Sequence, residues 1–198
     1  MEALNVIKRI KKLLLVMVVV YTVSFIIGYF TVPLGFYSTP EREEVIRNVL
    51  TQEPLKSVGQ AIVLGDLLTA ILLTFLTNFG VGAFLTTTLT GIFFPIPILV
   101  SIYRGWLIGL LYYEIFKSLP LTVVAVGTLI FEWGGYVLSS AVGVNIGLSL
   151  LFPSRYRLTN RFEAFKEAWK DAGRIYPIIL VLLVVGAVWE VLGIHLLI

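Results

Sequence analysis

The sequence contains no cysteine and a single histidine, and these absences exclude several kinds of site. Without cysteine there is no disulfide, no thiolate nucleophile, no iron–sulfur cluster and no cysteine-bound zinc. His195 alone cannot form a two-histidine metal site, and it argues against a Ser–His–Asp triad. A glycine-rich phosphate loop is also missing, so we expect no ATP hydrolysis by this chain. The sequence therefore predicts no metal, no cofactor and no enzymatic activity.

Charge is scarce as well, and this scarcity indicates a membrane protein. Charged residues make up 14% of the 198 residues and hydrophobic residues 58%, with a mean hydropathy of +0.96. Soluble domains are about 25% charged and about 45–50% apolar. We predict an all-α, polytopic membrane bundle forming a single membrane-embedded domain over 1–198, with about five transmembrane helices plus interfacial or re-entrant amphipathic helices. Its net charge of +3 needs no nucleic-acid partner.

The first apolar run, 13–32, follows four basic residues and is long enough to cross a bilayer. A cleaved signal peptide is the alternative interpretation. The apolar core is too long for one, and no small-x-small cleavage site follows it. We therefore expect an uncleaved first span with a cytoplasmic N-terminus, because cytoplasmic loops carry an excess of Lys and Arg.

Two polar segments set the expected orientation of the rest. Segment 33–60 has four acids against three bases, which suits an external amphipathic segment. Segment 153–175 has six Lys or Arg against three acids, which predicts a cytoplasmic amphipathic helix. The last span is then 178–198, and its C-terminus is external. The protein is expected in the cell membrane.

The segment between, 61–151, is predicted to be the membrane bundle. An odd number of crossings must connect an external 33–60 to a cytoplasmic 153–175. We expect three crossings, at 80–103, 105–119 and 131–151. Segment 61–78 is then an interfacial or re-entrant helix.

Small residues recur at four-residue spacing within the apolar segments. The two sets are Gly105 and Gly109, and Gly135, Ser139, Gly143 and Gly147. Such ladders let helix backbones approach closely in lipid, so both are predicted helix-packing seams. The sequence leaves open whether the seam joins helices of one chain or of two copies, and a homodimer is one expected outcome.

A few polar residues stand among apolar neighbours, and these are the candidate functional residues: Asp66, Asn78, Arg104, Glu132 and Glu190. A charge at mid-membrane costs about 2.5–3.5 kcal/mol on insertion scales, so such residues usually face a bundle interior and have partners. Arg104 is the first expected partner of Glu132. Backbone amides freed at a helix break near Gly134–Gly135 are the second.

Three roles for Glu132 and Glu190 remain open at this stage. They can be satisfied structural groups, members of a proton or ion path, or the carboxylate pair of an enzyme. The last is the weakest, because "VLGD" at 63–66 lacks the G-x-G-D form and the second aspartate of an intramembrane aspartyl protease.

Four apolar motifs, taken in order, resemble one family. The first is "FLTNFGVGAFLTTTLTGIFFPIP" (75–97), with Asn78 at the family's Asn position, and the second is "YRGWLIG" (103–109), with Arg104 where Asn is usual. The third is "TLIFEWGGYVLSSAVGVNIG" (128–147), which supplies Glu132 but lacks the Pro-His-Gly before it. The fourth is "VWEVLG" (188–193), which supplies Glu190. Over about residues 70 to 198 the chain resembles the stage II sporulation protein M family.

The resemblance implies a multi-pass scaffold that assembles as a dimer and recruits partners. In spore formers, members anchor cell-wall-cutting enzymes at the septal membrane, and homologues occur in prokaryotes that never sporulate. We therefore predict a membrane scaffold or membrane-organising protein whose partners are the lipid bilayer, a second copy, and an unidentified protein. The alternative is a transport component, such as a channel, a carrier or a permease subunit served by a separate ATPase. In that case Glu132, Glu190 and Arg104 line its polar path.

Overall fold

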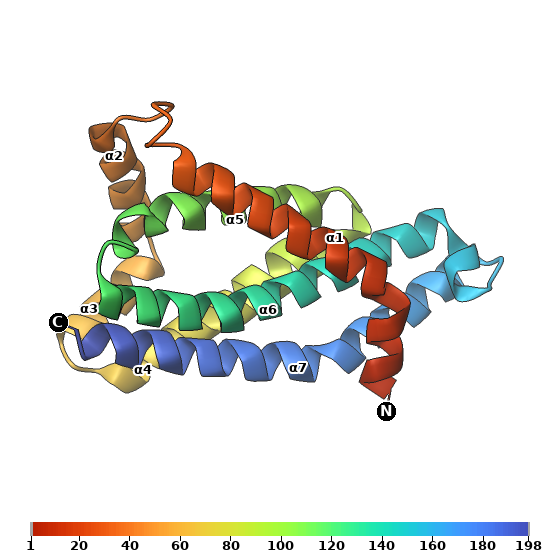
Figure 1. The fold of residues 1–198 in the computed structure, drawn as a ribbon. Coiled ribbons are helices and arrows are strands. Elements are labelled where there is room, and N and C mark those ends of the chain that lie inside the picture. Colours follow the sequence, from red (N-terminus) through yellow and green to blue (C-terminus); the bar gives the residue numbers. More distant parts are fainter. Residues whose placement is uncertain (1, 198) are drawn as a thin grey trace.

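Seven α-helices and three short helical segments form the chain over residues 2–197, which the computed structural model describes (Figure 1). The α-helices are α1 (Glu2–Phe30), α2 (Thr39–Leu50), α3 (Leu55–Val63), α4 (Leu67–Leu76), α5 (Ile96–Ile115), α6 (Leu119–Leu151) and α7 (Arg161–His195). A π-helical segment η1 (Thr77–Thr88) and a 3-10 turn η2 (Leu89–Ile92) continue α4, and a second 3-10 turn, η3 (Pro153–Tyr156), follows α6. The predicted all-α fold is confirmed.

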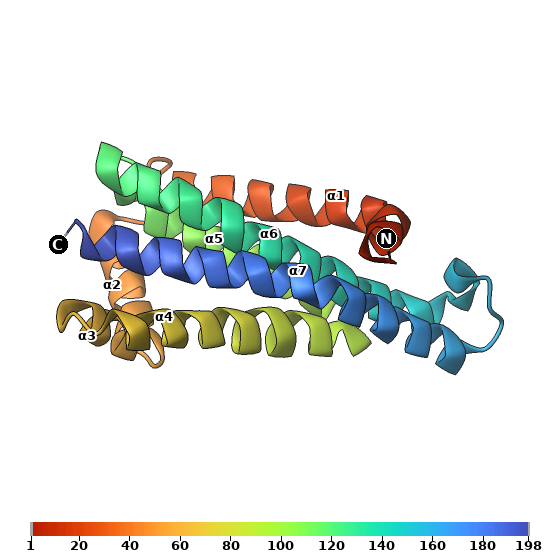
Figure 2. The same cartoon turned by 90° about the horizontal axis from the view of Figure 1, so that it is seen from below.

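Five helices are long and apolar enough to cross a bilayer: 2–30, 67–92, 96–115, 119–151 and 161–195. They run alternately between two ends of the molecule (Figures 1 and 2). The N-terminus, the turn at 93–95 and the loop at 152–160 lie at one end. Helices α2 and α3, the turn at 116–118 and the last described residues lie at the other, which we call the opposite end.

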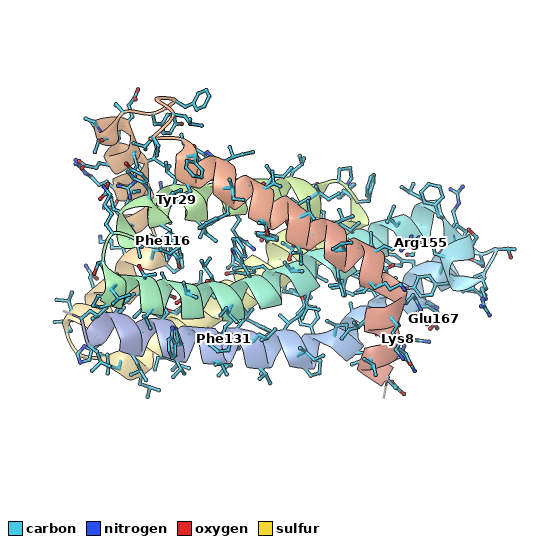
Figure 3. All side chains as sticks on the ribbon, in the orientation of Figure 1. Lys8, Tyr29, Phe116, Phe131, Arg155 and Glu167 are labelled. Carbon is cyan, nitrogen blue, oxygen red and sulfur yellow. The ribbon has the colours of Figure 1, made fainter. Side chains whose placement is uncertain are left out.

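Most of the positive charge gathers at the end that holds the N-terminus, which we call the basic end. Its cations are Lys8, Arg9, Lys11, Lys12, Arg155, Arg157, Arg161, Lys166, Lys170 and Arg174. Lys8, Arg155 and Glu167 are labelled at this end in Figure 3. This asymmetry is the pattern that the positive-inside rule describes.

The helix boundaries differ from the predicted crossings because the prolines begin helices rather than interrupt them. The "PIP" motif does not lie inside a crossing at 80–103. Pro95 and Pro97 begin α5, where a first turn tolerates proline because its N–H groups have no partner in the helix. Likewise Pro120 lies in the first turn of α6, so the last of the three middle crossings begins at Leu119 rather than at 131. The segment 67–78, predicted to be interfacial, is the first part of the helix 67–92.

Two more predicted features are corrected at the carboxyl end of the chain. The amphipathic segment 153–175 and the span 178–198 are not separate helices, because α7 runs without interruption from Arg161 to His195 through Pro177. The expected break at Gly134–Gly135 is absent, since α6 is continuous there. The final residue of the predicted last span, 198, lies outside the described residues.

The segment 33–60 forms two short helices at the opposite end. Ser38 and Glu41 make a capping box at the start of α2: Ser38 N donates to Glu41 Oε2 over 2.7 Å, and Glu41 N donates to Ser38 Oγ over 3.4 Å. The bonds from the Ser38 backbone and hydroxyl lower the pKa of Glu41. Arg42, which is buried, donates to the carbonyls of Leu110 and Leu111 over 2.9 and 3.1 Å. This side chain fixes α2 to the end of α5.

The second small-residue ladder joins α6 to η1 and η2 within one chain. A Cβ on Gly143 would overlap the carbonyl oxygen of Thr87, and one on Gly147 would overlap that of Gly91. Between them, the hydroxyls of Thr87 and Ser139 are hydrogen-bonded at 3.0 Å. Only the absence of side-chain carbons lets these backbones approach so closely.

The other seam residues also pack inside the protomer. Gly105 and Gly109 lie against α1, where a Cβ on Gly109 would overlap the carbonyl oxygen of Phe25. Gly135 lies against Leu183 of α7. Both ladders therefore pack against helices of the same chain.

We expect Gly143→Ala to lower the stability of the monomer rather than to dissociate an oligomer. The added methyl group must displace backbone, and overpacking of this kind costs about 1–3 kcal/mol. Gly173→Ala is the matched control, because nothing lies within 4 Å of a Cβ at that position. Thermal unfolding and light scattering in detergent measure both effects. An unchanged midpoint for Gly143→Ala, or a smaller particle, contradicts the intramolecular seam.

Candidate functional site

Four of the five candidate polar residues line one cavity inside the bundle: Asn78, Arg104, Glu132 and Glu190. The cavity has a volume of about 460 Å³ and is bounded by α4, η1, α5, α6 and α7, with residues of α2 and α3 at its opposite-end rim. We call it the polar cavity. Asp66 does not belong to it, because it is the exposed N-cap of α4 and accepts from Thr69 N over 3.3 Å.

Two carboxyl groups, those of Glu132 on α6 and Glu190 on α7, line the polar cavity together. Asn78 Nδ2 donates to Glu132 Oε1 over 2.5 Å. Helices α6 and α7 pack closely here, because Gly186 of α7 lies against the Glu132 side chain. The cavity therefore holds two carboxyl groups, of which Glu132 has a fixed amide donor.

Arg104 does not pair with Glu132, which corrects the sequence-based expectation. Its guanidinium lies over the ring of Tyr136, 4.1 Å from the centroid. Its Nη2 donates to the carbonyl of Gly82 over 3.3 Å and to Thr86 Oγ1 over 3.1 Å. The residue is thus held one helical turn nearer the basic end than the carboxyl pair.

The π-helical segment η1 supplies the acceptors for Arg104. Its wider turn leaves Gly82 O available to the side chains of Arg104, Thr86 and Thr87. Gly82 also makes room for Tyr136, since a Cβ there would lie 2.9 Å from the ring. Irregular helical turns of this kind are often found at functional sites, and nothing in the sequence "TNFGVGAFLTTT" predicted this one.

The polar cavity ends blindly toward the basic end. There, Thr88 Oγ1 accepts from the Tyr176 hydroxyl over 2.8 Å, and the backbone seam of Gly143 and Gly147 follows. Toward the opposite end, the cavity reaches Glu53 and neighbouring residues of the α2–α3 segment. The arrangement is a one-sided pocket rather than a pore through the described residues.

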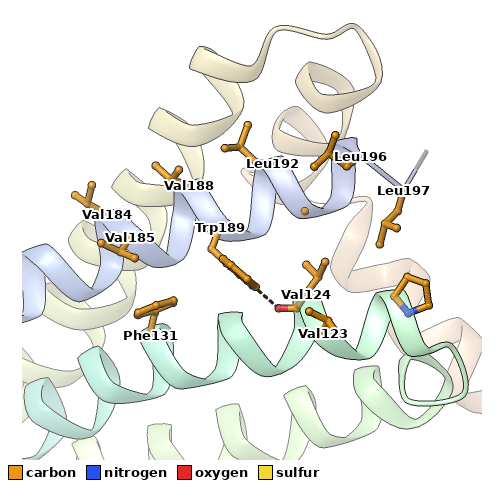
Figure 4. Close-up of a pocket in the computed structure, with 12 residues that line it drawn as sticks. Val123, Val124, Phe131, Val184, Val185, Val188, Trp189, Leu192, Leu196 and Leu197 are labelled. Atoms are coloured by element: carbon orange, nitrogen blue, oxygen red, sulfur yellow. Dashed lines mark hydrogen bonds between the residues drawn. The ribbon is translucent and has the colours of Figure 1, made fainter.

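A second cavity, of about 710 Å³, lies on the outside of α6 and α7 and is apolar (Figure 4). Valine and leucine side chains line it, and its one dashed contact is the bond from Trp189 Nε1 to the carbonyl of Val124 at 2.9 Å. Such a surface suits contact with lipid acyl chains. Among residues 2–197, no group of three His, Asp or Glu is placed to hold a metal ion.

Comparison with known proteins now adds a family. The model for stage II sporulation protein M matches residues 17–192. The chain belongs to this family. No curated protein and no solved structure matches it. Together with its five long apolar helices, membership identifies the chain as a multi-pass membrane protein of the stage II sporulation protein M family. Each of the four motifs that carry the family resemblance places at least one polar side chain in the polar cavity.

This family member has a second polar cluster, at the basic end, that sequence reasoning missed. Asp171 is 1% exposed and accepts from Arg9 at 2.6 Å, from the Tyr156 hydroxyl at 2.9 Å and from Arg174 at 3.1 Å. Asn145 Nδ2 donates to the Tyr156 oxygen over 2.6 Å. Burial raises the pKa of Tyr156 to about 12, so its hydroxyl stays protonated at neutral pH.

A helical repeat in the sequence could have revealed Asp171. The buried face of α7 near the basic end consists of Ala164, Ala168, Ala172 and Ile175, at spacings of four, four and three. Asp171 lies on that face. The larger apolar residues Phe162, Phe165 and Trp169 lie on the neighbouring face, and Phe162 is 60% exposed.

We expect Asp171→Asn to destabilise the protein, by about 1–3 kcal/mol, because it removes the charge that Arg9 and Arg174 share. Glu167→Gln is the control, since Glu167 forms an exposed pair with Lys170 at 2.7 Å and such pairs contribute less than about 1 kcal/mol. Thermal unfolding in detergent compares them. Equal midpoints for both variants would show that the buried cluster contributes nothing.

Proposed function

We propose that this protein is a non-enzymatic scaffold of the cell membrane, which organises partner proteins through its basic end. The observation that carries the proposal is the projection of the α6–α7 hairpin. Helices α6 and α7 have 33 and 35 residues, whereas a bilayer core requires about 20. At the basic end, the loop between α6 and α7 extends beyond α1 and α5 (Figure 1).

The surface of this projection suits a protein partner. Leu151, Phe152 and Phe162 are 51%, 56% and 60% exposed. The loop cations Arg155 and Arg157 are exposed beside them. Exposed aromatic side chains beside Arg are enriched in protein interfaces, and the charge favours an acidic partner. The positive-inside rule places this end in the cytoplasm, with the N-terminus, and the C-terminus outside. Self-association as a homodimer remains part of the proposal, through a surface other than the glycine ladders.

Single cysteines at Ser57 and Ser154 test orientation and partner together, with no native cysteine to interfere. We expect Ser154→Cys to label only from the cytoplasmic side and, carrying a photo-crosslinker, to capture one reproducible partner in native membranes. Replacing Phe162 by Ser should reduce this capture about tenfold, since an aromatic interface anchor is worth more than about 1 kcal/mol. Ser57→Cys should label from outside and should not capture the partner that Ser154→Cys captures. Capture of only a second copy of the chain, or labelling of both positions from one side, contradicts the proposal.

The second candidate function is a membrane transport component, and the polar cavity favours it. Intramembrane carboxyl groups form proton relays in many pumps and transporters. Against it, the polar cavity is closed toward the basic end by the Thr88–Tyr176 bond and the glycine seam.

Glu132 variants separate the two candidates. A structural Glu132 predicts that Glu132→Gln keeps expression and assembly, because the amide still accepts from Asn78, and that Glu132→Leu reduces both. A transport role predicts instead that Glu132→Gln folds normally but abolishes a pH-dependent flux in liposomes. Stability and flux are measured side by side. A fully stable Glu132→Leu variant without a flux defect would reject both roles for this residue.

A further inference from the structure

Unpaired polar atoms concentrate around the polar cavity. Within residues 2–197, the buried side-chain atoms without a hydrogen-bond partner are Tyr21 OH, Thr74 Oγ1, Arg104 Nη1, Thr128 Oγ1 and Trp133 Nε1. Four of these five residues line the polar cavity. The fifth, Tyr21, packs on Trp133, with the two ring centroids 6.1 Å apart. Folded proteins pair about 90% or more of such groups, and each unpaired one costs about 1–3 kcal/mol.

These atoms lie in layers along the cavity, and the layers differ in charge. Thr74 and Thr128 lie one helical turn from Asn78 and Glu132, toward the opposite end. The carboxyl groups of Glu132 and Glu190 follow. Arg104, with one positive charge, is deepest. A molecule inside the cavity therefore meets acceptors first and cationic or N–H donors last.

We propose that the polar cavity binds a zwitterion, a molecule that joins an amine to a phosphate or carboxylate. The amine contacts the carboxyl pair of Glu132 and Glu190, and the anionic group contacts Arg104 Nη1 and Trp133 Nε1. A neutral dipole with both ends paired adds no net charge at mid-membrane, where a net charge is costly. This inference goes beyond the scaffold role and does not depend on it.

The size and openings of the polar cavity fit such a ligand. Its volume of about 460 Å³ lies within the range of about 300–1,000 Å³ typical of small-molecule sites. The rim at Glu53 faces the opposite end, which admits a soluble zwitterion. Two other lining residues, Val81 on η1 and Tyr103 on α5, are 49% and 60% exposed on the outside of the bundle. Because these two lining residues also reach the outer surface, the proposed ligand includes a lipid headgroup, and the same chemistry can come from water or from the bilayer.

Binding can be measured on the full chain in detergent, from the thermal midpoint and by native mass spectrometry. The probes are O-phosphoethanolamine, dioleoyl phosphatidylethanolamine and, as an anion without an amine, dioleoyl phosphatidylglycerol. We expect one phosphoethanolamine group to bind per chain, saturably, and phosphatidylglycerol to bind at least tenfold more weakly. Binding of both amine probes identifies a soluble zwitterion as sufficient, whereas binding of the lipid alone identifies a headgroup site.

The variants assign the contacts. Arg104→Gln and the double variant Glu132→Gln, Glu190→Gln should each weaken binding about tenfold or more, the effect of losing one charge-assisted hydrogen bond of about 1.5–3 kcal/mol. Trp133→Phe removes one N–H donor without changing charge, and it serves if the charge variants fail to fold. Glu114→Gln is the control, because Glu114 pairs with Lys117 at the exposed end of α5, outside the cavity.

The opposite results overturn the proposal. Equal binding of phosphatidylethanolamine and phosphatidylglycerol, or equal binding by wild type, Trp133→Phe and Glu114→Gln, would show nonspecific lipid contact. Binding of no probe would show that the cavity holds only water. Neither result changes the outcome of the partner-capture experiment, so failure of this proposal is distinct from failure of the scaffold role.

Discussion

In hydrocarbon, each polar group must find its partner inside the protein, and the arrangement of this bundle follows from that constraint. Asn78, Glu132 and Glu190 come from three helical segments and line one cavity, where Asn78 donates to Glu132. Arg104 needs acceptors that a regular helix does not offer, and the π-helical turns of η1 provide them. The glycine seams also contribute, because they let the helix backbones pack closely enough for polar side chains of different helices to contact one another.

The two ends of the molecule divide the polar chemistry between them. The polar cavity opens toward the α2–α3 end and stops at the glycine seam, while the Asp171 cluster holds α1, α7 and the loop after α6 together at the basic end. The blind end favours binding over passage. The projecting hairpin, by contrast, exposes apolar and basic groups that the bundle itself does not need. The scaffold proposal rests on a helical bundle in the membrane that exposes one apolar and basic surface, on the α6–α7 hairpin.

Composition and charge were enough to predict the fold class and the five long helices, because the bilayer requires long apolar helices with charged residues at their ends. They were not enough to place helix ends, since Pro95 and Pro120 begin helices rather than interrupt them. The sequence identified Glu132 as a costly carboxylate but not its partner: Asn78 lies 54 positions away, and only packing brings the two together. Asp171 was missed because it stands in a charged segment, although its position on an alanine face indicated burial.

Because α7 is continuous, the hairpin at the basic end and Glu190 in the polar cavity belong to one helix. Asp171 and Glu190 lie on the same helix, about 28 Å apart at 1.5 Å per residue. An unbroken helix transmits torque along its axis, whereas a separate surface helix joined by a loop would absorb it. Pro177 is the one proline inside α7, and the backbone bond it cannot donate makes this the natural bending point. A force on the hairpin therefore acts on the same helix that carries Glu190, and Pro177 is the point between them where that helix can bend.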